Sequence, residues 1–495
     1  MSFAWFLLNL IYSFNRNMAI KFRNKYRIAS NYTVSGFLNL FRSLLFLFIF
    51  LSFFAGSALA QTKTEIKQTS EKKSPPERKS VTDKKDLFEN AEFFFDAEDY
   101  QEAVFYYLKL YDASPKNGNL AYHIGFCYLN SPGQEVKSIP FFEKAVPFIT
   151  PKFTPTTFKS TIEQTRAPLH TYFFLGQAYR MNNQMDKALD MLDKFSSSVY
   201  FEGNYNESMV NAEIEACKKA KIIMERPIEV EITNIGHEIN NQNENYNPVL
   251  TPDSSIIVYM NNLKFYNAIF MSRRENGKWT EADNITPQLG SDGESYPSSI
   301  SADGKTLYLV RTLKKNSDIC VSHYENGKWS IMEPLDENIN TKWNETNASI
   351  TADGKRLYFA SDRKGGLGGF DIWYSDLLAN GKWGKAINMG PNINTKIDED
   401  SPFPSVDGTT LFFASQGHES MGGFDIFYST KDGSQWSRAI NLGYPINTTL
   451  DDKFYFPIGN GTVGYMARRM PGGFGQRDIY RVKIIGGDPL KDLKK

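Results

Sequence analysis

Acidic side chains recur at five places in the C-terminal half of this 495-residue chain, each just ahead of an apolar run. Carboxylates around one opening attract a cation or a basic partner segment. They can instead form a solvated rim that caps neighbouring turns, and the sequence leaves both readings open. The five histidines lack the spacing of metal ligands, so we expect no metal and no cofactor. The acidic set comprises Glu244, Asp292, Glu294, Glu345, Asp398, Glu399, Asp400, Asp451 and Asp452.

A repeated turn predicts the strands that hold this acidic set. The string SADGKTLY at 301–308 recurs as TADGKRLY at 351–358 and as SVDGTTLF at 405–412. Asp-Gly supplies the positive φ angles of a tight hairpin. Degenerate copies begin at Thr251 and Gly459, so the units repeat every 50 to 54 residues.

Two further markers run in phase with the turn and complete each unit. One is an Asp-Ile pair that opens an apolar strand, and the other is a tryptophan. Each unit then offers four short strands, the size of one propeller blade. We expect the aspartates to accept N–H groups of their own hairpins and the tryptophans to pack between blades. The aspartates are Asp318, Asp371, Asp425 and Asp478, and the tryptophans are Trp279, Trp329, Trp383 and Trp436.

The first and last units are incomplete in complementary ways. The segment 229–240 resembles only the end of a unit, whereas the last unit stops after its Asp478-Ile479 strand. An N-terminal strand that supplies the missing outer strand would close the ring and leave no exposed edge. We therefore predict a five-bladed propeller of four-stranded blades, closed by residues 229–235.

The region before the propeller has helical periodicity in a frame of about 34 residues, the spacing of a tetratricopeptide repeat (TPR). Small residues in this frame allow two antiparallel helices to approach, and aromatic residues fill the space between them. The first frame contains Leu87, Ala91, Phe94, Ala103, Tyr107 and Leu110. Two more frames follow, separated by an extra stretch at 151–168, and an amphipathic helix at 206–224 caps the array.

The concave face of such an array is a candidate partner site. The TPR pattern assigns to that face several positions that hairpin packing does not need, and many of them are aromatic. Aromatic rings anchor peptides and helices. The alternative is that the extra stretch or the capping helix covers them. The predicted partner-binding residues are Phe88, Glu92, Phe95, Tyr122, Phe126, His170, Phe173, Gln177 and Arg180.

The N-terminal sixty residues have the features of an export signal. The apolar run LLFLFIFLSFFA at 44–55 is short for a membrane span and is followed by small residues at Ala58 and Ala60. We expect cleavage before Gln61 and a periplasmic location, with outer-membrane association only through partners. The expected organisation is an extension and signal peptide at 1–60, a disordered linker at 61–85, a TPR domain with its capping helix at 86–225, the propeller at 228–485 and a tail at 486–495.

Composition excludes some classes of partner. Basic and acidic residues balance at 56 each, so no net charge draws the chain to nucleic acid. Aromatic residues reach 14%, which favours β-structure and recognition surfaces. The three cysteines lie in apolar patterns and are expected to be buried free thiols, although a Cys127–Cys217 disulfide is possible in an oxidising compartment.

The propeller units resemble the WD40-like (PD40) repeats of the TolB propeller family. The resemblance rests on the turn strings at 297–309 and 347–359 and on the hairpins that end in Gly-Phe-Asp-Ile at 369–372 and 423–426. An exported TPR module before such a propeller resembles the front part of OmpA-family envelope proteins of Bacteroidetes, most closely the PorE-like group associated with type IX secretion. The OmpA-like domain of that family is not seen after the propeller, so peptidoglycan binding is not expected.

Catalysis is not expected from the residues. Sialidase propellers use an arginine triad and a turn with one residue between Asp and Gly, and that residue is missing here. Arg311, Arg363 and Arg468 lie at unequal offsets from their turns. No Gly-x-Ser-x-Gly elbow occurs. The sequence therefore predicts a non-enzymatic scaffold that binds other envelope proteins. The alternatives are a glycan-acting propeller enzyme of sialidase or glycosidase type and a ligand-binding regulator.

Overall fold

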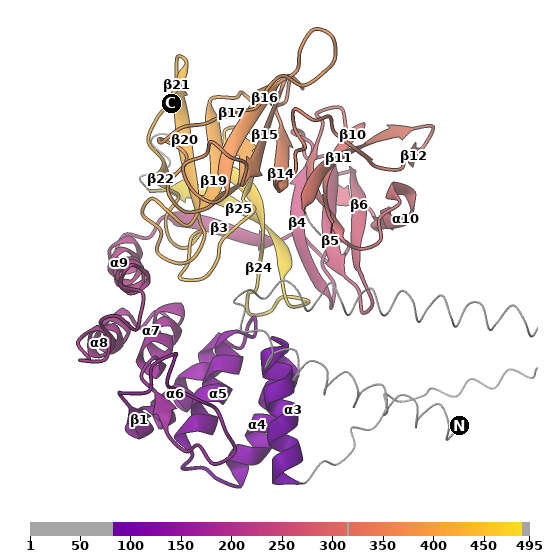
Figure 1. Ribbon diagram of the computed structural model, residues 1–495. Coiled ribbons are helices and arrows are strands. Elements are labelled where there is room, and N and C mark those ends of the chain that lie inside the picture. Colours follow the sequence, from indigo (N-terminus) through magenta and orange to yellow (C-terminus); the bar gives the residue numbers. More distant parts are fainter. Residues whose placement is uncertain (1–82, 314–315, 488–495) are drawn as a thin grey trace, which may run out of the picture. The chain divides into compact units, whose positions relative to one another are not determined.

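The computed structural model describes residues 83–313 and 316–487, a helical region followed by a β-propeller (Figure 1). The predicted signal peptide at 1–60 lies outside these residues. Helix α3 begins at Lys84, within the range expected to be linker, because Asp83 caps it by accepting the N–H groups of Lys85 and Asp86. Within the two described ranges, no helix is both long and apolar enough to cross a membrane.

The helical region consists of three helical hairpins and a longer final helix. Side chains of Asp83, Asp99, Asn117 and Asn206 cap four of the helix starts. The hairpins are α3 (Lys84–Asp96) with α4 (Tyr100–Asp112), α5 (Gly118–Leu129) with α6 (Ile139–Ala145), and α7 (Thr171–Met181) with α8 (Met185–Ser196); α9 (Glu207–Met224) follows. Short 3₁₀ turns at Glu135–Ser138 and Val146–Phe148 flank α6.

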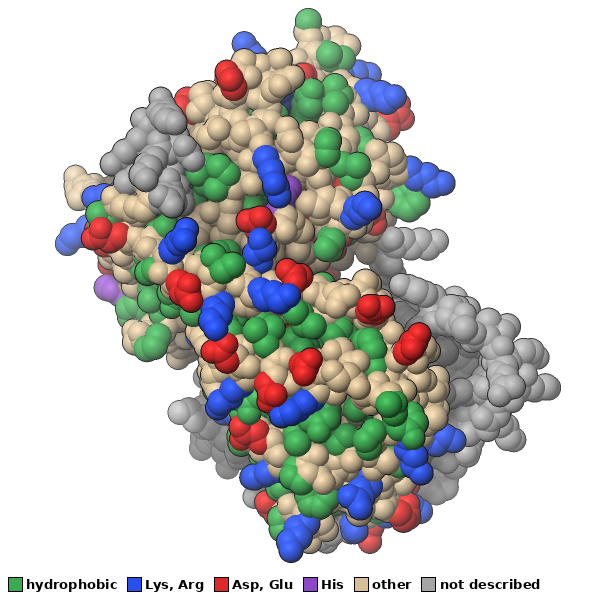
Figure 2. Space-filling view, turned by 90° about the vertical axis from the view of Figure 1, so that its left-hand side faces the viewer, with side chains coloured by type: hydrophobic (Ala, Val, Ile, Leu, Met, Phe, Trp, Pro, Cys, Tyr) green, Lys and Arg blue, Asp and Glu red, His purple; other side chains and the backbone are tan. Residues whose placement is uncertain are grey.

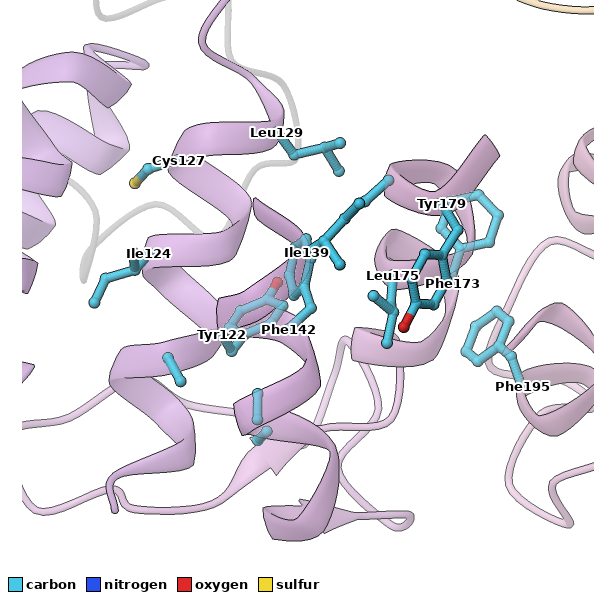
Figure 3. Packing of buried hydrophobic residues seen from close by; sticks show 14 of the residues in the cluster. Tyr122, Ile124, Cys127, Leu129, Ile139, Phe142, Phe173, Leu175, Tyr179 and Phe195 are labelled. Carbon is cyan, nitrogen blue, oxygen red and sulfur yellow. The ribbon is translucent and has the colours of Figure 1, made fainter. Parts of the chain in front are cut away.

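Small residues set the distance between the paired helices. Ala91 and Ala103 are fully buried in the first hairpin. A Cβ atom on Gly125 would lie 2.8 Å from the Phe142 ring, and one on Gly176 would lie 3.0 Å from Leu192. Figure 3 shows Phe142 next to Ile139, and Phe195 facing Phe173. The small positions predicted from the repeat frame therefore occupy the helix contacts.

The propeller has five blades, as predicted, but three of them have a fifth short strand in place of the four strands expected. Adjacent strands in every blade are antiparallel. The first blade comprises β4 (Glu244–Leu250), β5 (Ile256–Asn262), β6 (Asn267–Glu275), β7 (Lys278–Trp279) and β8 (Asp283–Asn284), and the second comprises β9 (Ser295–Ile300), β10 (Thr306–Thr312), β11 (Ser317–Glu325), β12 (Lys328–Trp329) and β13 (Glu333–Pro334). The third blade comprises β14 (Glu345–Ile350), β15 (Arg356–Ser361), β16 (Asp371–Asp376) and β17 (Ile387–Asn388), and the fourth comprises β18 (Glu399–Pro404), β19 (Thr410–Ser415), β20 (Asp425–Asp432), β21 (Gln435–Trp436) and β22 (Ile440–Asn441). The fifth blade comprises β23 (Phe456–Ile458), β24 (Val463–Arg468), β25 (Asp478–Gly486) and β3 (Glu229–Asn234).

The closure of the ring is also as predicted. Strand β3 pairs with β25 in antiparallel register, with Ile232 opposite Val482. Asn240 then accepts the N–H of Ile479 and donates to its carbonyl. Asn394 does the same to Ile372. Residues 229–240 therefore resemble the end of a unit because both contain an asparagine whose side chain bonds the N–H and the carbonyl of a residue in the third strand of a blade.

The repeated turns are fixed by their aspartates. Asp303 accepts the Ser301 hydroxyl at 2.6 Å and the Lys305 N–H at 3.0 Å, and Gly304 takes a φ of 68°. These hydrogen bonds lower the pKa of Asp303. Three of the Asp-Ile aspartates also act on backbone. Asp371 accepts the N–H groups of Leu367 and Gly368, Asp425 accepts that of Met421, and Asp478 accepts those of Phe474 and Gly475. That structural role is the one expected from the sequence.

The repeated tryptophans and the cysteines are mostly buried. Trp279, Trp329 and Trp383 are buried, and each lies in an apolar cluster of the propeller. Cys127, Cys217 and Cys320 are buried free thiols, as expected, so the possible Cys127–Cys217 disulfide does not form.

Candidate functional site

Four of the predicted partner-binding side chains meet in one aromatic face. Phe95 of α3, Tyr122 and Phe126 of α5, and His170 just before α7 lie together with Phe174 of α7. Ring centroids are 5.3 Å apart for Phe95 and Phe126, 4.9 Å for Phe126 and Phe174, and 5.4 Å for Tyr122 and His170. These rings come from the first helices of the three hairpins and from the residue that precedes one of them. The hairpin repeat therefore stacks them along one side.

A segment of the chain itself lies over this face. Residues 151–166, here called the insert, connect the two-residue strands β1 (Ile149–Thr150) and β2 (Ala167–Pro168), which pair in parallel. The Phe158 ring of the insert lies 5.8 Å from Tyr122 and 6.1 Å from His170. It also stacks on His123 at 6.3 Å. The alternative noted for the predicted positions, that the extra stretch covers them, holds for Tyr122 and His170.

Polar contacts align the insert with the helices. The Ser160 hydroxyl donates to Glu92, 2.9 Å away, and accepts from Asn119 at 3.5 Å. The Gly118 N–H donates to the Thr165 carbonyl at 2.9 Å. Glu92 also accepts the Tyr107 hydroxyl at 2.5 Å, which fixes its carboxylate. The face thus holds a segment without regular secondary structure through one ring, one hydroxyl and main-chain groups.

His170 is held between two hydroxyl groups beneath the insert. Its Nε2 lies 3.0 Å from the Tyr122 hydroxyl and its Nδ1 lies 3.3 Å from that of Tyr205. Burial and the neighbouring His123 lower the pKa of His170 to about 4. The ring is therefore neutral at physiological pH and acts as a hydrogen-bonding and stacking group.

The other predicted partner-binding residues are engaged elsewhere. Phe173 is 4% exposed and packs on Phe195 of α8 at 5.7 Å, so it belongs to the core rather than to a free surface. Gln177 and Arg180 both donate to Glu213 of the final helix α9. Arg180 also donates to the Thr449 carbonyl at 2.5 Å and is 5% exposed. Phe88 is partly buried against the helical core.

Three members of the acidic set are buried within the propeller. Glu345 accepts the N–H and hydroxyl of Thr341, and Glu399 accepts those of Thr395. Asp452 has the same relation to Thr448. Burial raises the pKa of Glu399 to about 7. Each carboxylate accepts hydrogen bonds from a threonine four residues earlier and so caps the loop between the two residues.

Two of the arginines considered for catalysis pair with two of these three carboxylates, Glu345 and Asp452. Arg363 donates to Glu345 at 3.1 Å and also to the Ile339 carbonyl. Arg468 donates to Asp452 at 2.8 Å and to the Pro445 carbonyl. Their guanidinium groups therefore fix the loops before the inner strands.

The other acidic residues occupy different environments. Asp398 and Asp451 accept the N–H groups of Phe370 and Phe424. Glu244 pairs with Arg477 at 2.5 Å. Asp292 and Glu294 are exposed.

Where the inner strands end at their turns, the cavity they enclose has a volume of about 30 Å³, room for about one water molecule.

Asp400 is half-buried and has a mixed set of neighbours. It accepts from Asn347 at 2.6 Å and lies 3.5 Å from the Lys453 ammonium group. A nearby cation and amide donor reduce any attraction that this carboxylate has for a second cation. Among the described residues, no group of three or more His, Cys, Asp or Glu side chains is arranged to hold a metal ion.

Sequence reasoning did not single out the residues of the insert. Phe158 and Ser160 make its main side-chain contacts with the aromatic face. A signal was present, because the insert interrupts the repeat frame and has only two aromatic residues, Phe153 and Phe158, among many threonines. Lys453 and Asn347, the neighbours of Asp400, were missed because they lie on different blades.

Comparisons with known proteins found similarity only to solved structures. No protein-family model matches the chain, and no curated protein matches it. Among solved structures it is similar to TolB from Acinetobacter baumannii, at 18% identity and a TM-score of 0.34 over 49% of this chain and 55% of TolB. The match thus spans about half of that protein.

A second group of similar structures consists of glycoside hydrolases. α-L-arabinofuranosidase from Lactobacillus brevis matches at 10% identity and a TM-score of 0.35, over 50% of this chain and 92% of the enzyme. A thermostable family-43 glycoside hydrolase matches at 12% identity and 0.36, over 50% and 95%. These likenesses describe the fold alone. They correct the expectation that the chain is not an enzyme, since propellers of this shape include enzymes and the fold does not exclude catalysis.

Proposed function

We propose that this chain is an interaction protein of a cell envelope that binds an extended segment of a partner on the aromatic face of its helical region. In this proposal the three hairpins are TPR repeats, and the propeller supplies a second binding surface of TolB type. The observation that carries the proposal is the insert, a segment of turns and irregular chain held on that face by an aromatic ring, a hydroxyl and backbone groups. A face that accepts such a segment has the chemistry of a peptide-binding groove.

The location and partner class in this proposal derive from the sequence. The apolar run at 44–55 and the small residues before Gln61 favour export to the periplasm. The partners are then other envelope proteins. The resemblance to PorE-like proteins of Bacteroidetes suggests a complex of the type IX secretion kind.

Affinity capture from the native envelope tests the proposal. Phe126 is half-buried in the aromatic face, and Phe126→Ala removes a ring without opening the centre of a hairpin. We expect this variant to capture at least tenfold less of the partner than the unaltered chain, a loss of about 1.4 kcal/mol or more. Phe93→Ala is the matched control, because Phe93 is 54% exposed on α3 and contacts Phe94 rather than the aromatic face. Equal capture by all three proteins would reject the proposed site.

A further inference from the structure

The insert has the position that a bound partner would take, and we propose that it is a resident pseudo-ligand of the aromatic face. A partner segment with an aromatic residue followed two positions later by Ser or Thr displaces it. This inference rests on the proposed function of the helical region, and it names the chemistry of the partner and the way in which the site is kept closed.

The side-chain contacts of the insert define that chemistry. Phe158 contributes its ring to Tyr122, His123 and His170, and Ser160, two residues later, donates its hydroxyl to Glu92. A threonine hydroxyl supplies the same donor. These two positions are specific, whereas the bond from the Gly118 N–H to the Thr165 carbonyl fits any sequence. An incoming segment therefore needs the aromatic-x-Ser/Thr pattern.

The insert is attached as a surface segment rather than as core. Of residues 151–166 only Thr154 is buried, and most of the others are exposed. The residues beneath differ, since Tyr122 and His123 are 6% and 3% exposed. Release of the insert therefore exposes a preformed aromatic surface and leaves the hairpin contacts at Gly125 and Gly176 in place.

The ends of the insert allow its removal. Ile149 pairs with Ala167 and Thr150 with Pro168, so the chain leaves and re-enters the helical region at one place. Because the two strands are parallel, the linker must run back from the end of β1 to the start of β2, a crossover that takes about a dozen residues. We therefore expect replacement of residues 151–166 by a twelve-residue Gly-Ser linker to keep both strands and all helices.

The test measures binding of a synthetic peptide of residues 151–166 to the otherwise intact chain. We expect a fluorescently labelled form of this peptide to bind the linker variant. It should bind at least tenfold more weakly to the unaltered chain, whose site is occupied by the insert. A peptide with Phe158→Ala is the matched control, and its binding to the linker variant should fall at least tenfold. The inference is overturned if the linker variant has the helical circular dichroism of the unaltered chain but does not bind the peptide.

A second variant covers the case in which the linker variant does not fold. Phe158→Ala with Ser160→Ala in the full chain removes both specific anchors. Hydrogen exchange at the Gly118 amide, which bonds to Thr165, should then accelerate at least tenfold, whereas exchange at the Ala121 amide, bonded to Asn117 within α5, should not change. Unchanged exchange at Gly118 would overturn the inference.

Partner capture separates this inference from the proposed function. The linker variant should capture at least tenfold more partner than the unaltered chain. If the linker variant and the unaltered chain capture the partner equally while the Phe126→Ala variant captures less, the proposed function stands and the pseudo-ligand proposal is wrong. If the peptide of residues 151–166 binds the linker variant but partner capture does not depend on Phe126, the proposed function fails. The binding of the insert to the aromatic face is then still supported.

Discussion

Phe173 and Phe126 were both assigned to the concave face, yet the structure gives them different roles. Phe126 packs among rings beside the insert, whereas Phe173 points to Phe195 in the core. Positions in a repeat frame therefore predict the side of a helix but not its neighbours.

We predict that Phe173→Ala destabilises the protein, in contrast to the small effect expected from its assignment to a free surface. The ring is 4% exposed, so truncation leaves a cavity and should lower the free energy of unfolding of the helical region by about 3 kcal/mol. Urea denaturation followed by far-ultraviolet circular dichroism measures the change. Phe93→Ala, with an exposed ring, should change it by less than about 0.5 kcal/mol. Equal effects of the two variants would contradict the packing described here.

Glu399 predicts a pH dependence of propeller stability. Burial raises its pKa in the folded state to about 7 from an ordinary value of 4.5. Between these values the folded chain keeps a proton that the unfolded chain has lost, so the free energy of unfolding falls as pH rises through this window. At about 1.4 kcal/mol per pKa unit, the fall is at most about 3.5 kcal/mol.

The matching variant is Glu399→Gln, which cannot titrate. Its free energy of unfolding should lack this decrease, so the difference from the unaltered chain should change between pH 4.5 and pH 7. Urea denaturation across that range measures it. Glu275→Gln, at an exposed position, is the control and should follow the unaltered chain. A constant difference for Glu399→Gln across the range would show that the carboxylate stays charged in the fold.

At the scale of elements, strand β3 joins the start of the propeller to its end. We predict that replacing Glu229–Asn234 by six Gly and Ser residues destroys the cooperative melting of the propeller. The replacement leaves β25 without its outer neighbour and exposes apolar residues such as Val482. Calorimetry should show a broad transition at lower temperature or aggregation. A transition as sharp as that of the unaltered chain would refute closure by β3.

The elements were predictable where a repeat imposed them. The Asp-Gly turns, the Asp-Ile strands and the small residues of the hairpins recur at fixed intervals, and each recurrence is a physical requirement of a turn or a helix contact. The insert, with a single buried residue and no repeat partner, gave no such signal. The acidic set illustrates the limit, because spacing predicts that carboxylates precede the strands but not that Thr341 and Arg363 enclose Glu345.

At the scale of the whole molecule, we do not expect net charge to select the proposed partner. Acidic and basic side chains are interspersed on the face that Figure 2 shows, in keeping with 56 of each in the chain. Under the proposal, recognition depends on shape and on aromatic contacts. Such contacts are concentrated on the helical region, where rings from three hairpins meet.

Site-specific cross-linking in the native envelope tests the central claim, that a protein partner binds at the aromatic face. A photo-reactive phenylalanine analogue is placed at Phe126, and in a matched protein at Phe93, in the full chain. We predict a discrete cross-linked partner from position 126, in yield at least tenfold above that from position 93. The adduct should fall when the peptide of residues 151–166 is added in excess. Absence of any adduct at position 126 while the same partner is cross-linked from position 93 would contradict the account.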